Sequence, residues 1–185
     1  MARESTITQG QVNAVADTIR AGGKCPAKEN EGVAVRLAVG DEVYVIHPVD
    51  MLHLKMVTED MIRLGAPKIR IVRHSMGFWV ALEGCHRMRA AHDLGTDVIW
   101  HQVDRDARLA VGFDGVNGAI ELSTKTRLYL ECVIGPGADD CYSAGDLAEA
   151  LISPGSCAFS VAENGKLVML GDHDYSDDDD CSLVG

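Results

Sequence analysis

The sequence contains no apolar run that approaches the roughly 20 residues needed to cross a bilayer. Its first residues, MAREST, also lack the apolar segment of a signal peptide. From these two absences we expect a soluble, cytoplasmic protein with no membrane partner.

Basic residues are also scarce, because 17 Lys and Arg face 28 Asp and Glu and the net charge is -11. Proteins that bind duplex DNA along its phosphates usually carry a basic surface, so this balance disfavours DNA as a partner. It leaves room for a local basic pocket. Six acidic residues fall in a predicted solvated tail, and without them the net charge of -11 becomes about -5; they are Asp172, Asp174 and the four aspartates at 177–180.

The sequence has no Cys-x-x-Cys pair and no His-x-x-x-His pair, so we predict no metal site made of protein ligands. In a reducing cytoplasm the expected state of all the cysteines is the free thiol. They are Cys25, Cys85, Cys132, Cys141, Cys157 and Cys181.

What the sequence does have is a hydrophobic content of 46%, enough for one ordinary domain with an appendage in 185 residues. Residues 1–40 are predicted to form an N-terminal helix (7–21, ended by Gly22-Gly23) and a linker. A compact α+β unit is expected over 41–104 and a small C-terminal α+β extension over 105–171. An acidic tail then covers 172–185.

Within the 41–104 unit the pattern predicts strand, helix, strand, strand, helix, strand. The strands are expected at 43–46, 69–72, 78–82 and 98–103, with a hairpin turn between the second and third. One or two short helices are expected over 49–64, with Thr58 as the N-cap of the second. A further helix over 86–94 is capped by Gly95.

Outside this unit the pattern is weaker. We predict strands at 33–37 and 127–134, and a short helix over 143–151 with Ser143 as its N-cap. A hairpin over 157–170 is expected to turn at Glu163-Asn164-Gly165, because Asn-Gly strongly favours a tight turn.

The turn Gly84-Cys85-His86-Arg87 lies between a predicted strand and a predicted helix. A glycine there lets backbone N–H groups face a ligand, and the helix dipole adds positive charge, which together make an anion site. Arg87 and Arg89 lie in the first turn, where the dipole disfavours cations unless an anion neutralises them. The alternative is that both arginines pair with Glu83, Asp93 or the acidic tail.

The segment 81–95 closely resembles the signature of the ParB/sulfiredoxin superfamily, in which a strand ends in Gly-x-x-Arg-x-x-Ala and a helix closes with Leu-Gly. The matching positions are Gly84, Arg87, Ala90 and Leu94-Gly95. The strand before His47-Pro48 and the Ala66-Pro67 step also match, so the resemblance covers 41–104. It implies a mixed-sheet fold that binds ATP, or another nucleoside triphosphate, with Mg²⁺.

Members of this superfamily use the fold differently. ParB proteins bind and hydrolyse CTP while clamping DNA, and sulfiredoxins use ATP to repair an oxidised cysteine. Related small kinases phosphorylate free serine, and some plasmid and phage relatives are described as nucleases or ATPases.

Gly-Cys-His-Arg also matches the sulfiredoxin active-site tetrapeptide, which makes Cys85 a candidate nucleophile whose thiolate a helix N-terminus would favour. The alternative is a small residue at a variable position, since Glu83 stands where sulfiredoxins have glycine and their Pro-Pro-Ile-Asp is absent. His86 is a candidate phosphate ligand or acid–base group, or else only a helix cap.

Asp50 is a candidate base that could also hold Mg²⁺ through water; the alternative is a solvated acid at the start of a helix. Lys55 could contact phosphates or be an ordinary surface lysine.

Three functions follow from these observations. The first is an ATP-dependent hydrolase or small phosphotransferase in which Gly84, Cys85, His86, Arg87 and Arg89 hold the nucleotide. The second is a DNA-associated partition factor or nuclease of plasmid or phage type. The third is a non-catalytic nucleotide sensor or inhibitor that acts through a protein partner.

Overall fold

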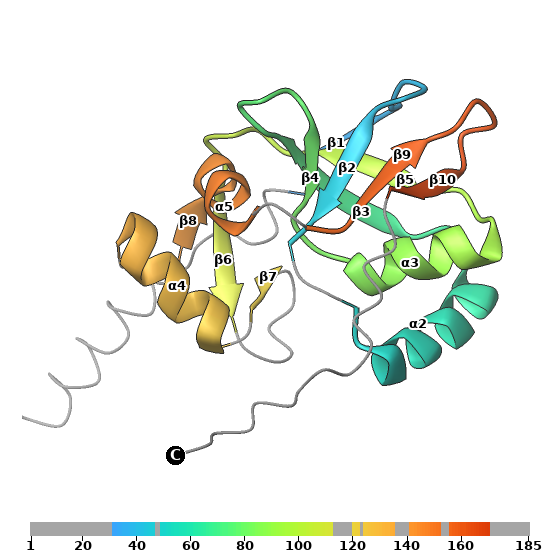
Figure 1. The fold of residues 1–185 in the computed structure, drawn as a ribbon, viewed down its shortest axis with the longest axis horizontal. Helices are drawn as coiled ribbons and strands as arrows, with labels where there is room; N and C mark the ends of the chain where they lie inside the picture. The colour runs from blue at the N-terminus through green and yellow to red at the C-terminus, as the bar shows by residue number, and fades with distance from the viewer. Residues whose placement is uncertain are drawn as a thin grey trace, which may run out of the picture.

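The computed structural model describes residues 31–46, 49–112, 120–122, 124–135, 141–152 and 156–170 (Figure 1). The predicted helix over 7–21, the His47-Pro48 turn and the acidic tail lie outside these residues. The described chain is a mixed α+β structure, as expected. None of its helices has the length and apolar character that a membrane span requires.

The main sheet has seven strands in the order β1-β5-β3-β4-β2-β9-β10. The pairs β2–β4 and β3–β5 are parallel, and the other neighbours are antiparallel. The strand bounds are β1 Val33–Val35, β2 Glu42–Val45, β3 Lys68–Arg73, β4 Trp79–Ala81, β5 Ile99–Gln102, β9 Ala158–Val161 and β10 Leu167–Leu170. The sheet therefore includes strands from before and after residues 41–104, namely β1 on one side and β9 and β10 on the other.

Helices α2 (Met51–Leu64) and α3 (Cys85–Leu94) lie side by side against one face of this sheet (Figure 1). In α3 the buried residues Cys85, Met88 and Ala91 recur every three positions, which forms one apolar stripe. Leu54 and Met61 make the corresponding stripe of α2. The helices and the facing side chains of the strands form the first hydrophobic core.

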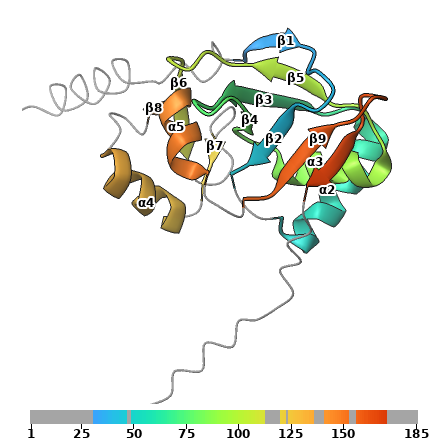
Figure 2. The ribbon, with the colours of Figure 1, turned by 45° about the horizontal axis from the view of Figure 1, so that its top comes forward.

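The second core lies on the other side of the central strands, because successive side chains of a strand point to opposite faces. Val72, Val80 and Leu82 belong to this core, whereas Ile71 and Ala81 belong to the first. A small sheet in the order β7-β6-β8 and two helices supply most of the rest of it (Figure 2). Their bounds are β6 Arg108–Gly112, β7 Ile120–Glu121, α4 Thr124–Ile134, β8 Cys141–Ser143 and α5 Ala144–Leu151.

The element order predicted for 41–104 is confirmed, from β2 through α2, β3, β4 and α3 to β5. The β3–β4 hairpin is also confirmed, as is the β9–β10 hairpin, where Gly165 has φ 79°. Ser143 caps α5, since its hydroxyl accepts a hydrogen bond from Asp146 N.

The strand predicted at 127–134 is wrong, because this segment belongs to helix α4. A strand facing the core would bury alternate residues, but Leu130 is fully buried while Leu128 and Cys132 are exposed. Burial falls instead on Leu130 and partly on Thr126, four residues apart, as in a helix. The apolar, β-favouring composition of the segment misled the prediction, and packing against α5 determines the outcome.

The N-cap predicted at Thr58 is also wrong, because α2 is one continuous helix whose N-cap is Asp50. The Thr58 hydroxyl donates instead to the carbonyl of Leu54, four residues back, so the side chain is satisfied within the helix.

The expectation that every cysteine is a free thiol fails at Cys141, which is disulfide-bonded. Cys85, Cys132 and Cys157 are free. Irregular spacing in the sequence carries no signal for such a bond, since pairing depends on which cysteines the fold brings together.

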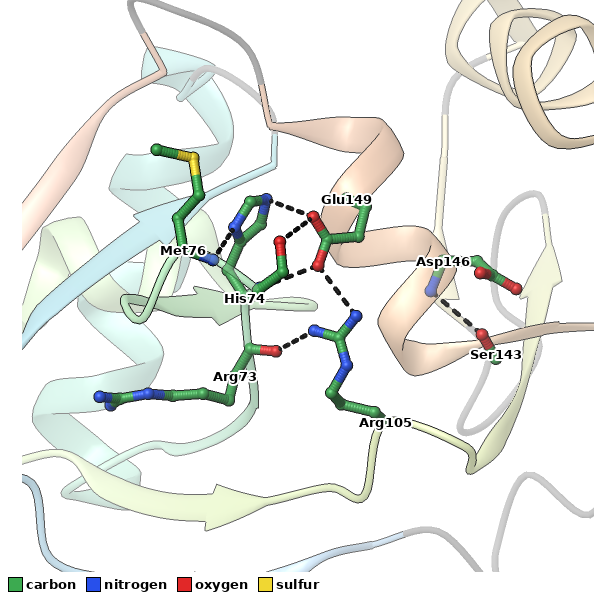
Figure 3. Close-up of polar contacts among 8 residues, drawn as sticks. Arg73, His74, Met76, Arg105, Ser143, Asp146 and Glu149 are labelled. Carbon is green, nitrogen blue, oxygen red and sulfur yellow. Dashed lines mark hydrogen bonds and ion pairs between the residues drawn. The ribbon is translucent and has the colours of Figure 1, made fainter.

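Helix α5 is joined to the β3–β4 turn by the carboxylate of its residue Glu149 (Figure 3). One oxygen accepts hydrogen bonds from Ser75 N and Arg105 Nη2, each at 2.9 Å. The other lies 2.8 Å from Ser75 Oγ and 2.9 Å from His74 Nε2. The ring of His74 is buried and accepts at Nδ1 from Met76 N, so Nε2 carries the proton donated to Glu149.

Burial alone would raise the pKa of Glu149, but the hydrogen bonds from Ser75 and Arg105 and the electrostatic interaction with His74 outweigh it and lower the pKa. A carboxyl whose pKa is lower in the folded state stabilises the fold above its unfolded pKa of roughly 4.3. This stabilisation is lost as the pH falls through the lower folded value.

We therefore predict that Glu149→Ala lowers the free energy of unfolding by about 1–2 kcal/mol at pH 7, because several donors, including the buried His74, lose their acceptor. The difference from wild type should shrink below about pH 4. Urea unfolding across this pH range measures both effects. Glu163→Ala, which removes an exposed charge from the β9–β10 turn, is the control and should change little. An equal loss in both variants would contradict the assigned role.

Candidate functional site

Two helices begin at the same edge of the sheet, because each follows one strand of the parallel β2–β4 pair. In this pair Val43 lies opposite Trp79 and Val45 opposite Ala81, so both strands end at the same level. The chain then enters α2 after Asp50 and α3 after Gly84. The positive ends of two helix dipoles are therefore neighbours at the carboxyl ends of parallel strands, a common location of ligand sites in open sheets.

A direct contact joins the two helix starts. Asp50 N donates to Nε2 of His86 at 2.9 Å, and Asp50 Oδ1 accepts from His53 N at 2.7 Å as the N-cap of α2. The rings of His53 and His86 stack with their centroids 4.4 Å apart. The structure thus brings together two predicted site residues, Asp50 and His86, and adds His53, which the sequence analysis did not select.

Gly84 is the N-cap of α3 and has left-handed backbone angles, φ 79° and ψ 30°. A Cβ at this position would lie 2.5 Å from Cδ1 of the buried Ile69, so the space also requires glycine. A left-handed residue directly before helical ones orients successive N–H groups to one side, an arrangement that binds anions. As a glycine, Gly84 supplies no side-chain cap to this helix start.

The guanidinium of Arg87 lies across Gly84. Its Nε and Nη2 are 3.1 and 3.2 Å from the position that a Gly84 Cβ would take. Nη1 donates to the carbonyl of Lys68 at 2.9 Å, and Nη2 is 3.7 Å from Glu83 Oε2. The side chain keeps 36% of its surface exposed, so the charge lies at the surface beside the helix start.

Glu83 is paired mainly with Arg70, a residue absent from the sequence-based candidates. Arg70 Nε and Nη2 donate to the two carboxylate oxygens at 3.0 and 3.1 Å, a bidentate pair. The side chain of Arg70 is only 10% exposed. No motif spacing signals this contact, because the two residues meet only through the β3–β4 pairing.

Arg89 is not brought to the turn. Its Nε contacts both carboxylate oxygens of Asp93 at 3.1 and 3.2 Å, and Nη1 lies 3.6 Å from the sulfur of Met169 on β10. These contacts correspond to the alternative considered above, in which Arg89 pairs with Asp93. Lys55 is exposed on α2.

Cys85 is 2% exposed at the first position of α3. Burial raises the pKa of its thiol to about 12, and the backbone N–H of His86 and the charge of Arg87 only partly oppose this. At neutral pH the group is therefore a protonated thiol, whereas a nucleophilic cysteine needs its thiolate.

The contacts of His86 support the same conclusion. Since Nε2 accepts from Asp50 N, the ring is neutral and its proton is assigned to Nδ1, which lies 3.2 Å from Cys85 Sγ. In this arrangement His86 donates toward the sulfur and cannot remove its proton.

Within the described residues no group of three or more His, Cys, Asp or Glu side chains is arranged to hold a metal ion.

Searches with this chain found no matching family model, no similar curated protein and no similar solved structure.

We predict that Gly84→Ala destabilises the protein by about 2–3 kcal/mol, since it combines left-handed strain with a clash against Ile69. Gly95→Ala is the matched control. Gly95 is also left-handed, with φ 60°, but a Cβ there meets nothing within 4 Å, so strain alone should cost about 1 kcal/mol. Chemical unfolding measures both, and equal losses would refute the close packing at Gly84.

We also predict that Cys85 reacts with iodoacetamide far more slowly than the exposed Cys132 between pH 7 and 9. The reason is its raised pKa together with its burial. Peptide mass spectrometry of the native protein after timed alkylation gives both rates. Comparable rates would show that Cys85 is an activated, accessible thiol, and alkylation in urea verifies that both cysteines can react.

Proposed function

We propose that this protein binds the phosphates of a nucleoside triphosphate at the start of α3, with Gly84 and Arg87 as the principal contacts. The observation that carries the proposal is the meeting of two helix N-termini beside a left-handed glycine and a surface guanidinium. Each of these features favours a multiply charged anion, and a triphosphate can contact all of them together.

The residues around the turn fit such a ligand. Gly84 avoids the clash with Ile69 that a Cβ would make, and the guanidinium of Arg87 lies beside the same position. Asp50 and His86 hold the second helix start beside the first. The order of elements from β2 to β5 and the mixed sheet agree with the ParB/sulfiredoxin-like fold suggested by the Gly84, Arg87 and Ala90 motif. We include that fold in the proposal.

As an enzyme, the protein would hydrolyse the nucleotide or transfer its terminal phosphoryl group to a small substrate. Arg87 and the first-turn N–H groups of α3 would stabilise the charge on the phosphoryl oxygens. Asp50 would accept the proton of the attacking water or hydroxyl. Mg²⁺, bound by the phosphates and through water by Asp50, would neutralise further negative charge.

A non-catalytic nucleotide sensor is the second candidate, and the state of Cys85 favours it over cysteine chemistry. The thiol is buried and protonated, and the neutral His86 donates toward it. Neither Cys85 nor His86 is arranged for nucleophilic attack. A protein that binds a nucleotide without a covalent step would need neither group to be reactive.

A DNA-associated role finds less support. In the described part of the chain after residue 104, the helices α4 and α5 are separated by strand β8, whereas a helix-turn-helix needs a short turn. The net charge of -11 also opposes broad contact with phosphates along a duplex.

Calorimetric titration with ATP, CTP and GTP in the presence of Mg²⁺ tests the proposal. We expect at least one nucleotide to bind, and Arg87→Ala to weaken it about tenfold or more, the loss typical of a charge-assisted contact. Arg89→Ala is the control, since it removes the same charge from the same helix but from a residue paired with Asp93. Absence of binding by the wild-type protein would refute the proposal.

Release of inorganic phosphate separates the two candidates. Turnover that Asp50→Asn abolishes and Cys85→Ser preserves supports the hydrolase or phosphotransferase without a cysteine nucleophile. Binding with no turnover in the presence of Mg²⁺ supports the sensor.

A further inference from the structure

We infer that Arg70 and Glu83 form a positioning pair that keeps Arg87 available for an anionic ligand. The inference rests on the proposed phosphate site and assigns roles to two residues outside it. Arg70 would act by occupying the carboxylate of Glu83, so that this carboxylate does not capture the arginine at the turn.

The distances show how unequally Glu83 is shared. Both of its oxygens are engaged by Arg70 at 3.0 and 3.1 Å, whereas Arg87 approaches only one of them, at 3.7 Å. The closer hydrogen bond of Arg87 goes to the backbone carbonyl of Lys68, at 2.9 Å. Among the described residues, Arg87 is therefore held mainly by a backbone carbonyl, and its contact with the Glu83 carboxylate is the longer one.

The exposed fractions of the side chains also distinguish Arg70, which pairs with Glu83, from Arg87, which lies at the surface. The side chain of Arg70 is 10% exposed and that of Arg87 is 36% exposed, with Glu83 between them at 27%. The three side chains together carry one net positive charge, and its exposed end is the guanidinium beside Gly84. A buried arginine is suited to the bidentate role, because its planar fork matches both carboxylate oxygens.

Without Arg70 the balance would change. Glu83 would keep its negative charge and lose both close donors, and Arg87 is the cation already within 3.7 Å. A close pair between Glu83 and Arg87 would then compete with the ligand for the same guanidinium. Removing the Glu83 charge as well should abolish this competition.

A simple structural salt bridge makes a different prediction. If the pair only stabilised the sheet, removing Arg70 would lower the free energy of unfolding. Removing the Glu83 charge in addition would then not restore the affinity for the ligand. The test is therefore a rescue of affinity by a second substitution.

The test measures the affinities of ATP and of inorganic tripolyphosphate for wild type, Arg70→Met and the double variant Arg70→Met/Glu83→Gln. We expect Arg70→Met to weaken both ligands about fivefold, the equivalent of one partly exposed charge interaction. The double variant should return to within about twofold of wild type. Lys166→Met, which removes an equal charge from a pair with Asp97 elsewhere, should leave both affinities unchanged.

A double variant that binds as weakly as Arg70→Met would overturn the inference, as would an unchanged affinity in Arg70→Met. Circular dichroism confirms that each variant is folded. If Arg70→Met does not fold, Arg70→Lys takes its place, since lysine keeps the charge but cannot make the bidentate contact. Arg70→Lys should weaken binding less than the fivefold expected for Arg70→Met. Adding Glu83→Gln to Arg70→Lys should again restore the affinity.

A second measurement needs no nucleotide. Urea unfolding of Glu83→Gln, Arg87→Gln and the combined variant gives the coupling between Glu83 and Arg87, and the cycle is measured both with Arg70 present and in the Arg70→Met background. Expressed as a ratio of unfolding equilibrium constants, the coupling should be about fivefold larger without Arg70. An increased coupling in a protein that binds neither ligand would refute the proposed function and leave the pairing role intact. An unchanged coupling would refute the pairing role itself.

Discussion

The parallel pairing of β2 with β4 is the constraint on which the candidate site depends. Two neighbouring strands that run in the same direction must be joined by a crossover, and each passes its chain into a helix at the same edge of the sheet. The starts of α2 and α3 are therefore neighbours, and the hydrogen bond from Asp50 N to His86 joins them. An antiparallel pair would place the two helix starts at opposite edges.

The same central strands also connect the two halves of the molecule. Their alternating side chains supply one core under α2 and α3 and another under α5 and the small sheet. Nonpolar contacts would allow several relative placements of α5, but the carboxylate of Glu149 accepts directed bonds from the β3–β4 turn and from Arg105. This polar cluster selects one placement.

At the candidate site, the groups proposed to contact an anion and the thiol of Cys85 have different surroundings. The guanidinium of Arg87 is partly exposed beside Gly84, where the proposal places a phosphate. Cys85 points into the core, where burial keeps its thiol protonated. One residue along a helix turns a side chain by about 100°, so adjacent members of the Gly-Cys-His-Arg motif have different surroundings. The two roles therefore need not occur together.

Much of this arrangement could be predicted from local sequence, because strands, turns and helix starts depend on nearby residues. The elements from β2 to β5, the capping role of Ser143 and the special position of Gly84 are of this kind. Helix α4 was not predictable in this way, since its apolar residues suit a strand as well and only packing against α5 decides between them. The pairing of Arg70 with Glu83, the stacking of His53 on His86 and the burial of Cys85 join residues from separate elements. Tertiary structure alone decides such contacts, because charge balance and burial depend on which distant residues the sheet brings together.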